Sequence, residues 1–525
     1  MTYDLAREKA SADVMSRRSF LGLTGAVGAA LLLGACSSDG DGTATTGVAS
    51  APTSIAGPPG GQLRVGALGA ALATLDPAQV QGNADYLAVL HVFDSLVRLK
   101  GGEVELWLAE SIEPNADATT WTLRLRPDAT FHDGAPVRAA DAAYSLRTLA
   151  ASPFFGQFLA DIDHPNLRVR DERTVEMPLL RPRADLVEGA LAIGITVYPD
   201  GATDFSRPVG SGPFRVASFE PGRSTVLEAN PDHWSGAPMV QRVEITTVAD
   251  ATARLDGVRS GALDLAMRVT PAGARSAGDD VVAIRGVESD ADVFGFVMNI
   301  TKAPFDLPEV RRACKLACDR QALVDTVMLG QGTVGNDLMG LGMAGYDRRI
   351  PQREHDPDEA RRLFASAGVR RLSLRVADLT PGIVAAGELY AEQLRAVGVD
   401  TDLQRADAAT YFNDYAALLA TPFQGIYFIN RPVAAALPFL TGSRSTFNVS
   451  SYAPPGHDDL LARAQSTLDA RARAELFHQA QRGVWADGGD LLWGYQRVLH
   501  AVRPGVEGVV LTQSFPLLAD VTVPS

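Results

Sequence analysis

Apolar and polar positions follow a regular pattern from about residue 61 onward. Short segments with strand-like alternation exchange with segments whose apolar residues recur every three or four positions. Trp121, Leu123 and Leu125 share one face of a predicted strand, and residues 356–368 predict a helix with an acidic first turn and a glycine stop. Because strands and helices alternate with short links, the pattern predicts an α/β fold rather than a barrel or a bundle.

Two helices predicted from this pattern bear on later arguments. Residues 86–102 are expected to form one amphipathic helix that ends at a glycine pair. Cys314 and Cys318 lie four positions apart on a second predicted helix. No neighbouring His or Asp pattern completes a metal site, and a strain-free disulfide is unfavourable at this spacing. We therefore expect both cysteines on the buried face of the helix and predict no metal site.

The first sixty residues have a different character. The apolar run 21–33 is too short to span a bilayer, and it follows the pair Arg17-Arg18. This order resembles a twin-arginine export signal, and residues 33–36 resemble a lipobox in which Cys36 becomes the lipidated N-terminus. The interpretation is a lipoprotein signal peptide over 1–36 and a flexible tether over 37–60, which is rich in Ser, Thr, Gly, Ala and Pro. The start codon is Met1 or Met15.

Composition narrows the function classes. The chain has 525 residues, of which 46% are hydrophobic and 21% charged, so it has room for two or three domains. A net charge of −14 argues against nucleic-acid partners and against adhesion to anionic lipid. Neither a nucleophile elbow nor an HExxH helix is present. The glycine motif at 330–335 follows a predicted helix instead of a strand, which disfavours a dinucleotide site. We expect no cofactor and no enzymatic activity.

An ordered series of motifs resembles a known family. The segments are TLDPAQ, VFDSLVRL, TTWTLRLRPDATFHDGAPVRAADAAYSL, PVGSGPFRVASFEPG, LEANPDHWSGAP and MNITKAPFDLPEVRRACKLACDRQALVDTVMLGQG. Together they cover most of the chain and are similar to family 5 of the extracytoplasmic solute-binding proteins, which serve ABC importers of the peptide and nickel type.

The resemblance implies a two-lobed, periplasmic-binding-protein-like fold of type II, in its large three-domain variant with a hinge and an inter-lobe cleft. Domain I is expected over 61–99, 209–289 and 503–525, domain II over 100–208, and domain III over 290–502. Residues 210–212, Gly-Ser-Gly, are either a hinge or a tight turn before a strand.

The implied function is capture of a peptide-like or other organic solute by lobe closure, and its delivery to permease subunits in the membrane. The expected protein is an exported monomer, lipid-anchored at the outer face of the cytoplasmic membrane. Three alternatives stay open: a binder of a chelated metal or haem, with His457 as a loop contact, a receptor that signals, and an extracytoplasmic hydrolase.

One departure from the family pattern concerns the ligand. Peptide-binding members usually carry an aspartate, in a pattern like Ala-Asp-Tyr-x-x-Pro, that pairs with the amino terminus of the ligand. Here residues 427–432 read Tyr-Phe-Ile-Asn-Arg-Pro and contain no acid. Arg431 instead suits a carboxylate or phosphate of an anionic ligand, unless it forms an ion pair at the rim or between the lobes.

The resemblance also implies which other residues border the cleft. In the predicted strand 293–300, one of two alternating sets faces the ligand, unless its aromatic rings belong to the core. The ligand-binding candidates are Asn83, Tyr86, Phe294, Phe296, Asn299, Tyr427, Asn430, Arg431, Phe447 and Asn448.

Overall fold

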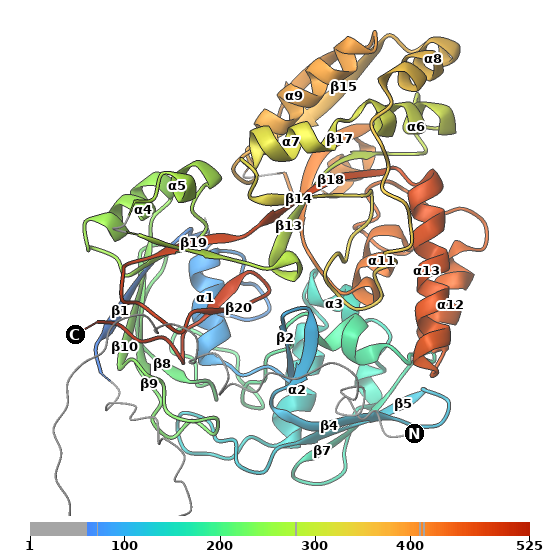
Figure 1. Ribbon diagram of the computed structural model, residues 1–525. Helices are drawn as coiled ribbons and strands as arrows, with labels where there is room; N and C mark the ends of the chain where they lie inside the picture. The colour runs from blue at the N-terminus through green and yellow to red at the C-terminus, as the bar shows by residue number, and fades with distance from the viewer. Residues whose placement is uncertain (1–59, 71, 279–280, 409–410, 413–414, 525) are drawn as a thin grey trace, which may run out of the picture. The chain divides into compact units, whose positions relative to one another are not determined.

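The computed structural model describes residues 60–524 except 71, 279–280, 409–410 and 413–414 (Figure 1). The predicted export signal with Arg17 and Arg18, the lipidation site Cys36 and the tether up to residue 59 lie outside this range. Within it, the strands form three sheets of seven, four and six strands and two small hairpins. No helix of the described chain has both the length and the apolar character needed to cross a membrane.

The seven-stranded sheet gathers strands from both ends of the described chain. Leu63 and Val65 of its central strand β1 are buried, and Gln62 pairs in parallel register with Arg242 of β10. The sheet order is β12–β19–β11–β1–β10–β9–β8, with β1 (Gln62–Ala67), β8 (Phe214–Glu220), β9 (Ser224–Ala229), β10 (Arg242–Thr247), β11 (Leu265–Ala266), β12 (Val282–Arg285) and β19 (Leu499–Val502). Its helices are α1 (Asn83–Val92), α4 (Ala251–Arg259) and α5 (Pro271–Arg275).

The helix predicted over 86–102 is wrong in its second half. Helix α1 ends at Val92, and Val97–Lys100 form strand β2 of a hairpin with β3 (Glu103–Leu106). Gly101 and Gly102 have positive φ and make the turn. Ser95 lies in an isolated bridge to Thr196, so pairing with a distant segment takes these residues away from the helix.

The residues that lie in sequence between β1 and β8 form a four-stranded antiparallel sheet. The predicted alternation in β5 is confirmed, because Trp121, Leu123 and Leu125 are all buried. The sheet order is β4–β5–β7–β6, with β4 (Ala109–Pro114), β5 (Thr120–Leu125), β6 (Arg168–Val169) and β7 (Thr174–Pro178). It is accompanied by α2 (Ala139–Leu149), α3 (Phe155–Leu159), η1 (His164–Asn166) and the π-helical turn η2 (Val187–Leu191).

The six-stranded sheet takes almost all of the remaining chain. Helix α6 is one of the helices that accompany it. Cys314 lies within this helix and Cys318 at its end, and both are buried thiols that form no disulfide. The sheet order is β14–β18–β13–β17–β15–β16, with β13 (Ala291–Met298), β14 (Gly332–Val334), β15 (Arg371–Val376), β16 (Asp400–Arg405), β17 (Phe423–Ile429) and β18 (Asp490–Arg497). Its helices are η3 (Glu288–Asp290), α6 (Pro308–Ala317), α7 (Arg320–Val327), α8 (Pro357–Ala367), α9 (Ile383–Ala396), α10 (Tyr415–Ala420), α11 (Val433–Thr441), α12 (His457–Ser466) and α13 (Ala470–Asp487). The small C-terminal hairpin pairs β20 (Val510–Thr512) with β21 (Phe515–Leu517).

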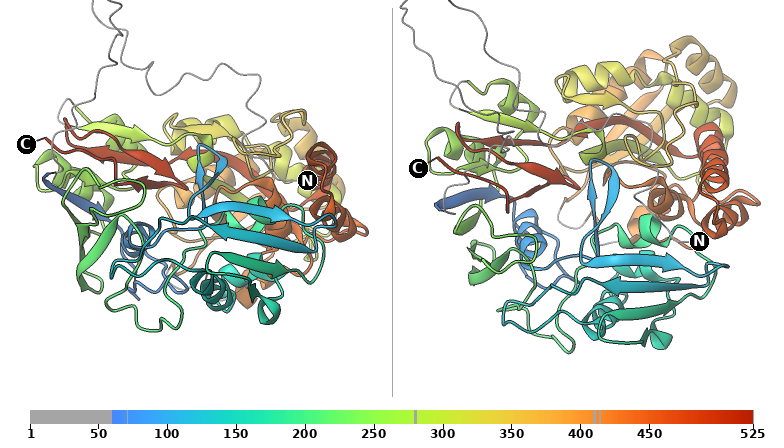
Figure 2. Two further views of the ribbon diagram at one scale, coloured as in Figure 1. Left: turned by 90° about the horizontal axis from the view of Figure 1, so that it is seen from below. Right: turned by 60° about the horizontal axis from the view of Figure 1, so that its bottom comes forward.

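The chain passes between the two large sheets at two places. It leaves β12 at Arg285 and enters β13 at Ala291, and it returns from β18 to β19 with only Val498 between them. The return is the continuous red segment labelled β18 and β19 in Figure 1, and Figure 2 shows it from two further directions. One nearly uninterrupted extended segment therefore belongs to both sheets.

Residues 210–212 pack closely against the end of α1. The Gly212 amide donates to the Val92 carbonyl at 2.9 Å. A Cβ atom added at Gly210 would lie 1.8 Å from that carbonyl oxygen, and one at Gly212 would lie 2.4 Å from the His91 oxygen. Neither glycine has positive φ, so close backbone approach explains both residues.

Candidate functional site

Phe294 and Phe296 belong to a hydrophobic core. Both are fully buried on β13. Phe296 stacks on Tyr390 with ring centres 4.6 Å apart, and Phe294 meets Trp493 at 5.5 Å. Strand alternation turns them toward the core with α6 to α9, whereas Val293 and Val297 face the core shared with the other two sheets. The structure thus corrects the expectation that these two rings line the ligand site.

The side-chain amides of Asn299, Asn430 and Asn448 serve the main chain. Each is at most 5% exposed, and each bonds to backbone groups of neighbouring segments. Asn430, for example, accepts from the Gly340 amide at 2.9 Å and donates to the Leu341 carbonyl at 2.8 Å. Because these bonds use the amide groups, we assign the three residues to loop support and not to ligand contact.

Three other predicted residues, Tyr86, Tyr427 and Arg431, come together near the end of β17. Arg431 follows this strand, and Tyr427 lies within it. Asn83 begins α1, and Tyr86 on the same helix packs on Phe515 with ring centres 4.5 Å apart. The phenol groups of Tyr86 and Tyr427 are both near enough to Arg431 to influence its pKa. Elements far apart in the sequence therefore meet around one guanidinium.

Aromatic rings surround the Arg431 side chain. Its guanidinium carbon lies 5.5 Å from the ring centre of Phe154, 5.9 Å from that of Phe158 and 5.1 Å from that of Phe439. These separations are typical of cation–π contacts. Phe447, another of the predicted residues, stacks on Phe439 with ring centres 4.6 Å apart.

The position of Arg431 is fixed by its neighbours in sequence. Its amide donates to the Asn430 Oδ1 atom at 3.1 Å, and its Nη1 atom donates to the Ile429 carbonyl at 3.2 Å. Pro432 then precedes the first residue of α11. The proline restricts the backbone φ angle at residue 432, so the strand does not continue past Arg431. The two hydrogen bonds hold the backbone and the guanidinium of Arg431 in place.

Arg431 is half-buried, and the protein atoms around its guanidinium shift the pKa of this group. Removal from water lowers the pKa of this side chain to about 10, and Tyr86 and Tyr427 counteract part of that shift. The group is therefore positively charged at neutral pH. No carboxylate of the described residues forms an ion pair with it, and its guanidinium contacts the Ile429 carbonyl and aromatic rings. An enclosed cation without a counter-charge is the arrangement expected for binding an anionic group.

A neighbouring arginine is already paired. Arg268 follows β11 and donates from Nη1 to Asp292 Oδ2 at 2.6 Å. Burial raises the pKa of Tyr427, Asp292 raises it further, and Arg268 and Arg431 oppose the change. Because Arg268 and Asp292 neutralise each other, the excess positive charge at this place belongs to Arg431.

A cavity of about 900 Å³ borders the same aromatic rings. Phe158 and Phe439 form part of its wall, and the remainder comes from segments 152–161, 180–189 and 434–465. Arg431 contacts these two rings but does not line the cavity. The ring pair therefore contacts the guanidinium and also borders the cavity.

His457 is not a loop residue. It begins α12, is 5% exposed, and its Nε2 atom lies 2.8 Å from the Thr441 hydroxyl. Burial lowers its pKa. Over the described part of the chain, no group of three or more His, Cys, Asp or Glu side chains is arranged to hold a metal ion.

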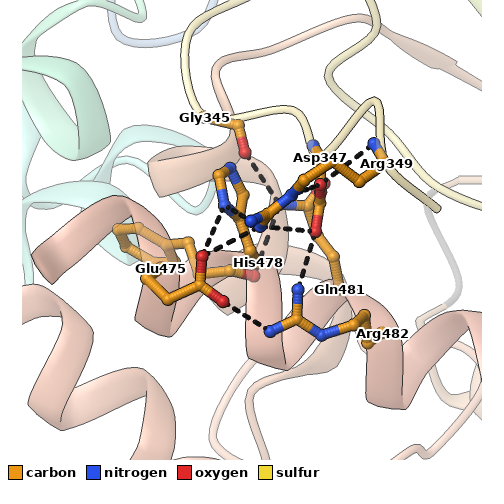
Figure 3. A network of polar contacts seen from close by, with 8 residues as sticks. Gly345, Asp347, Arg349, Glu475, His478, Gln481 and Arg482 are labelled. Carbon is orange, nitrogen blue, oxygen red and sulfur yellow. Dashed lines mark hydrogen bonds and ion pairs between the residues drawn. The ribbon is translucent and has the colours of Figure 1, made fainter. Parts of the chain in front are cut away.

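Other arginines have their charge fully engaged by acids. In the network of Figure 3, Asp347 accepts from Arg349 at 2.7 Å and from Arg482 at 2.9 Å, and Glu475 accepts from the same two arginines at 2.9 and 2.7 Å. His478 adds a contact to Arg349 at 2.7 Å. These contacts attach the loop around Asp347 to α13 and leave neither arginine available for a ligand.

Sequence analysis did not identify Phe154, Phe158, Phe439, Arg268 or Asp292. The segment SPFFGQFL contains three phenylalanines, but such a cluster usually indicates a core. Only the fold brings this segment of the chain to Arg431.

Comparisons with known proteins agree with the fold and identify a family and relatives. The model of the bacterial extracellular solute-binding proteins, family 5, matches residues 103–428. The probable D,D-dipeptide-binding periplasmic protein DdpA of Escherichia coli is 26% identical over 482 residues, which are 85% of this chain and 90% of the relative.

Solved structures show the same architecture. The periplasmic binding protein DppA from Helicobacter pylori, in complex with the peptide STSA, gives a TM-score of 0.75 at 19% identity and covers 88% of this chain and 98% of its own. MoaA from A. tumefaciens R10, in complex with mannopinic acid, gives 0.74 at 23% identity and covers 88% and 99%.

Proposed function

Because this chain belongs to family 5 of the bacterial extracellular solute-binding proteins, we propose that it is the receptor of an ABC importer for an organic, peptide-like solute that carries an anionic group. The chain captures this solute outside the cytoplasmic membrane and delivers it to permease subunits. The periplasmic dipeptide-binding relative from E. coli supports the place of action and the solute class. The family consists of binding proteins, so the function is recognition and not turnover.

The proposed site of action depends on the N-terminal segment. Arg17-Arg18 and the apolar run that ends at Cys36 support export followed by lipid attachment at that cysteine. Residues 37–60 then act as a tether that keeps a monomeric receptor close to its permease.

The proposed domain arrangement follows the three sheets. Domain I corresponds to the seven-stranded sheet, domain II to the four-stranded sheet and domain III to the six-stranded sheet. Strand β19, which the boundary at residue 502 assigns to domain III, pairs within the seven-stranded sheet. We therefore shift this boundary to Val498. Closure of the domains around the solute would remove it from water.

The single observation that carries the ligand class is the Arg431 environment. An enclosed, positively charged guanidinium without an acidic partner occupies the segment where peptide-binding relatives are expected to present an acid. A free peptide amino terminus would be repelled there, whereas a carboxylate or phosphate gains a bidentate, charge-assisted contact. Because His457 is buried and bonded to Thr441, it does not offer the loop contact that the alternative of a metal chelate or haem assigned to it.

Native mass spectrometry of the full-length chain, purified without refolding, tests this proposal. We expect a co-purified organic acid or phosphate of defined mass that is absent from the Arg431→Ala variant. A ladder of ordinary peptide masses in both proteins would contradict the anionic class. Turnover of the ligand by the purified chain would contradict a role in binding alone.

A further inference from the structure

The C-terminal hairpin, labelled β20 in Figure 1, turns over two residues that both have positive φ. Thr512 pairs with Phe515 across the hairpin, which leaves a loop of only two residues. These are Gln513, with a φ of 45°, and Ser514, with a φ of 74°. A turn of this kind usually takes asparagine or glycine, because other side chains crowd the backbone there. Such a strained turn persists only where neighbouring groups hold it in place.

Both crossings between the two large sheets bond to Ser514. The first crossing is segment 286–290, and the Ser514 hydroxyl donates to the Asp290 carbonyl at 3.0 Å. The second crossing is at Val498, and the Nε2 atom of nearby His500 lies 3.2 Å from the Ser514 carbonyl. Ser514 itself is fully buried. One residue of the hairpin therefore connects the two places at which the chain changes sheets.

The other ring nitrogen of His500 fixes the direction of its bond to Ser514. Nδ1 accepts from the Arg268 amide at 3.2 Å, so the proton is on Nε2, which donates to the Ser514 carbonyl. Burial lowers the pKa of His500 to about 3. The ring is therefore neutral at physiological pH, and its bond to the hairpin does not change there.

The tip of the hairpin is also attached to segments that take no part in the crossings. The Thr512 hydroxyl donates to the Leu99 carbonyl on β2, and the Gln513 side-chain amide donates to the Ala192 carbonyl at 2.5 Å. Both acceptors precede β8 in the chain, and neither belongs to the six-stranded sheet. The tip is thus bonded to the crossings and held from another direction as well.

We propose that the hairpin tip, residues 512–515, is a mechanical stop that limits rotation between the two large sheets. Such a rotation changes the backbone angles of segment 286–290 and of Val498, because the chain passes between the sheets only there. The Gly286 amide donates to the Val498 carbonyl at 2.9 Å, so the two crossings move together. Since Ser514 bonds to both, a large rotation has to break its bonds. The stop acts in the same way whichever solute the chain binds.

Hydrogen–deuterium exchange of the full chain tests whether Ser514 holds the crossings. Ser514→Ala removes the bond to the first crossing and retains the carbonyl bond to the second. We expect the amides of 284–292 and 496–502 to exchange about fivefold faster, the scale of one lost hydrogen bond, and those of β5 to stay unchanged. The matched control, Ser466→Ala, removes an exposed hydroxyl that bonds to the Arg463 carbonyl at 3.2 Å, and it should leave both segments unchanged.

A second variant separates the stop from the integrity of the turn. Glycine adopts a φ of 74° without strain, so Ser514→Gly favours the turn while it removes the hydroxyl. If Ser514 only stabilised the hairpin, this variant would exchange no faster than the wild type at the crossings. The stop predicts exchange as fast as in Ser514→Ala.

Spin-label distance measurements by pulsed electron paramagnetic resonance test the rotation itself. The labels are placed at Ala253→Cys on α4, beside the seven-stranded sheet, and at Ser366→Cys on α8, beside the six-stranded sheet; both positions are exposed. The full chain carries Cys36→Ser, and its two other cysteines are buried. We expect Ser514→Ala to widen the distribution of distances between the labels, because the sheets then turn further.

Three results would overturn the stop. The first is unchanged exchange at both crossings in Ser514→Ala. The second is faster exchange throughout the chain, β5 included, which would mean a general loss of stability. The third is a label distribution as narrow as in the wild type, because the sheets would then turn no further without the bond.

Discussion

Arg320 and Arg431 are both arginines enclosed by the fold, yet their surroundings serve different purposes. The Arg320 side chain is 3% exposed and donates to Asp337 Oδ1 at 2.6 Å, while the other oxygen of Asp337 accepts from Arg353 at 2.7 Å. Arg431 has aromatic rings and a carbonyl instead of an acid. A compensated guanidinium stabilises the fold, whereas an uncompensated one remains available to a ligand.

The pKa values of the two arginines also shift in opposite directions. Burial opposes the charged form of Arg320, but Asp337 outweighs it and the pKa of Arg320 rises. Burial also raises the pKa of Asp337, yet Arg320, Lys315 and Arg353 bring it below its ordinary value. At Arg431 burial prevails and lowers the pKa to about 10. A charge–charge partner is therefore present in one site and missing in the other.

The largest expected effect is on stability, at the compensated site. Asp337→Asn removes the acid between Arg320 and Arg353 and leaves buried positive charge, so the free energy of unfolding should fall by about 3–5 kcal/mol. Chemical denaturation of the full chain measures this loss. Asp325→Asn, on the exposed face of α7, is the control and should change little. If Asp337→Asn changed the free energy of unfolding as little as the control does, the acid would not be what compensates the buried charges of Arg320 and Arg353.

The next effect concerns ligand affinity at the uncompensated site. Arg431→Ala should weaken the binding of an anionic ligand by roughly 1–3 kcal/mol, the scale of a charge-assisted contact. Calorimetric titration measures this loss, and denaturation of the same variant measures separately what the cation–π contacts of Arg431 contribute to stability. Arg431→Lys retains the charge but not the planar fork, so its affinity should be intermediate. Unchanged affinity for Arg431→Ala would remove this residue from the site.

A smaller effect is expected from the rings around Arg431. Phe154→Leu retains an apolar side chain but removes one aromatic face, which is worth about 0.5–1 kcal/mol for a cation–π contact. The stability of the ligand-free chain should fall by this amount. No matching substitution can be made at the Arg320 site, because an acid and not an aromatic ring compensates the charge there. A loss above about 3 kcal/mol, the scale of emptying a core position, would mean that Phe154 acts mainly as core.

The smallest effect is expected at the surface network of Figure 3. Bonds from Arg482 and Arg349 lower the pKa of Glu475 to about 2. A depressed folded-state pKa stabilises the fold above the unfolded value near 4.5 and ceases to do so as the pH falls toward 2. Glu475→Gln should therefore lower the melting temperature slightly at pH 7 and not at pH 2. A difference that persists at pH 2 would exclude this cause.

Local patterns predicted much of the fold. In β5, the alternation of Trp121, Leu123 and Leu125 identified the buried face because one side of that sheet packs on a core. The family resemblance predicted the architecture that the solved structures share. The strand Val97–Lys100 was missed because its conformation depends on pairing with β3 and on the turn at Gly101 and Gly102, while its composition also suits a helix.

The candidate site was predictable only in part. The missing acid in residues 427–432 predicts a role for Arg431 at the site, and Tyr86 and Tyr427 do lie near it. Strand alternation alone does not reveal that both faces of β13 are buried, with Phe294 and Phe296 in one core and Val293 and Val297 in another. The rings of Phe154 and Phe158 approach Arg431 through contacts between distant segments, which a single sequence does not encode as a pattern.

The shared strand β18–β19 has a mechanical consequence. Since only Val498 separates the parts that belong to the two large sheets, a rotation between them at this crossing is concentrated in the backbone dihedrals of very few residues. An extended ribbon of this kind bends but does not lengthen, unlike a loose linker. At this crossing the two sheets are therefore joined by one short extended segment, which leaves them less freedom to separate than a loose linker would.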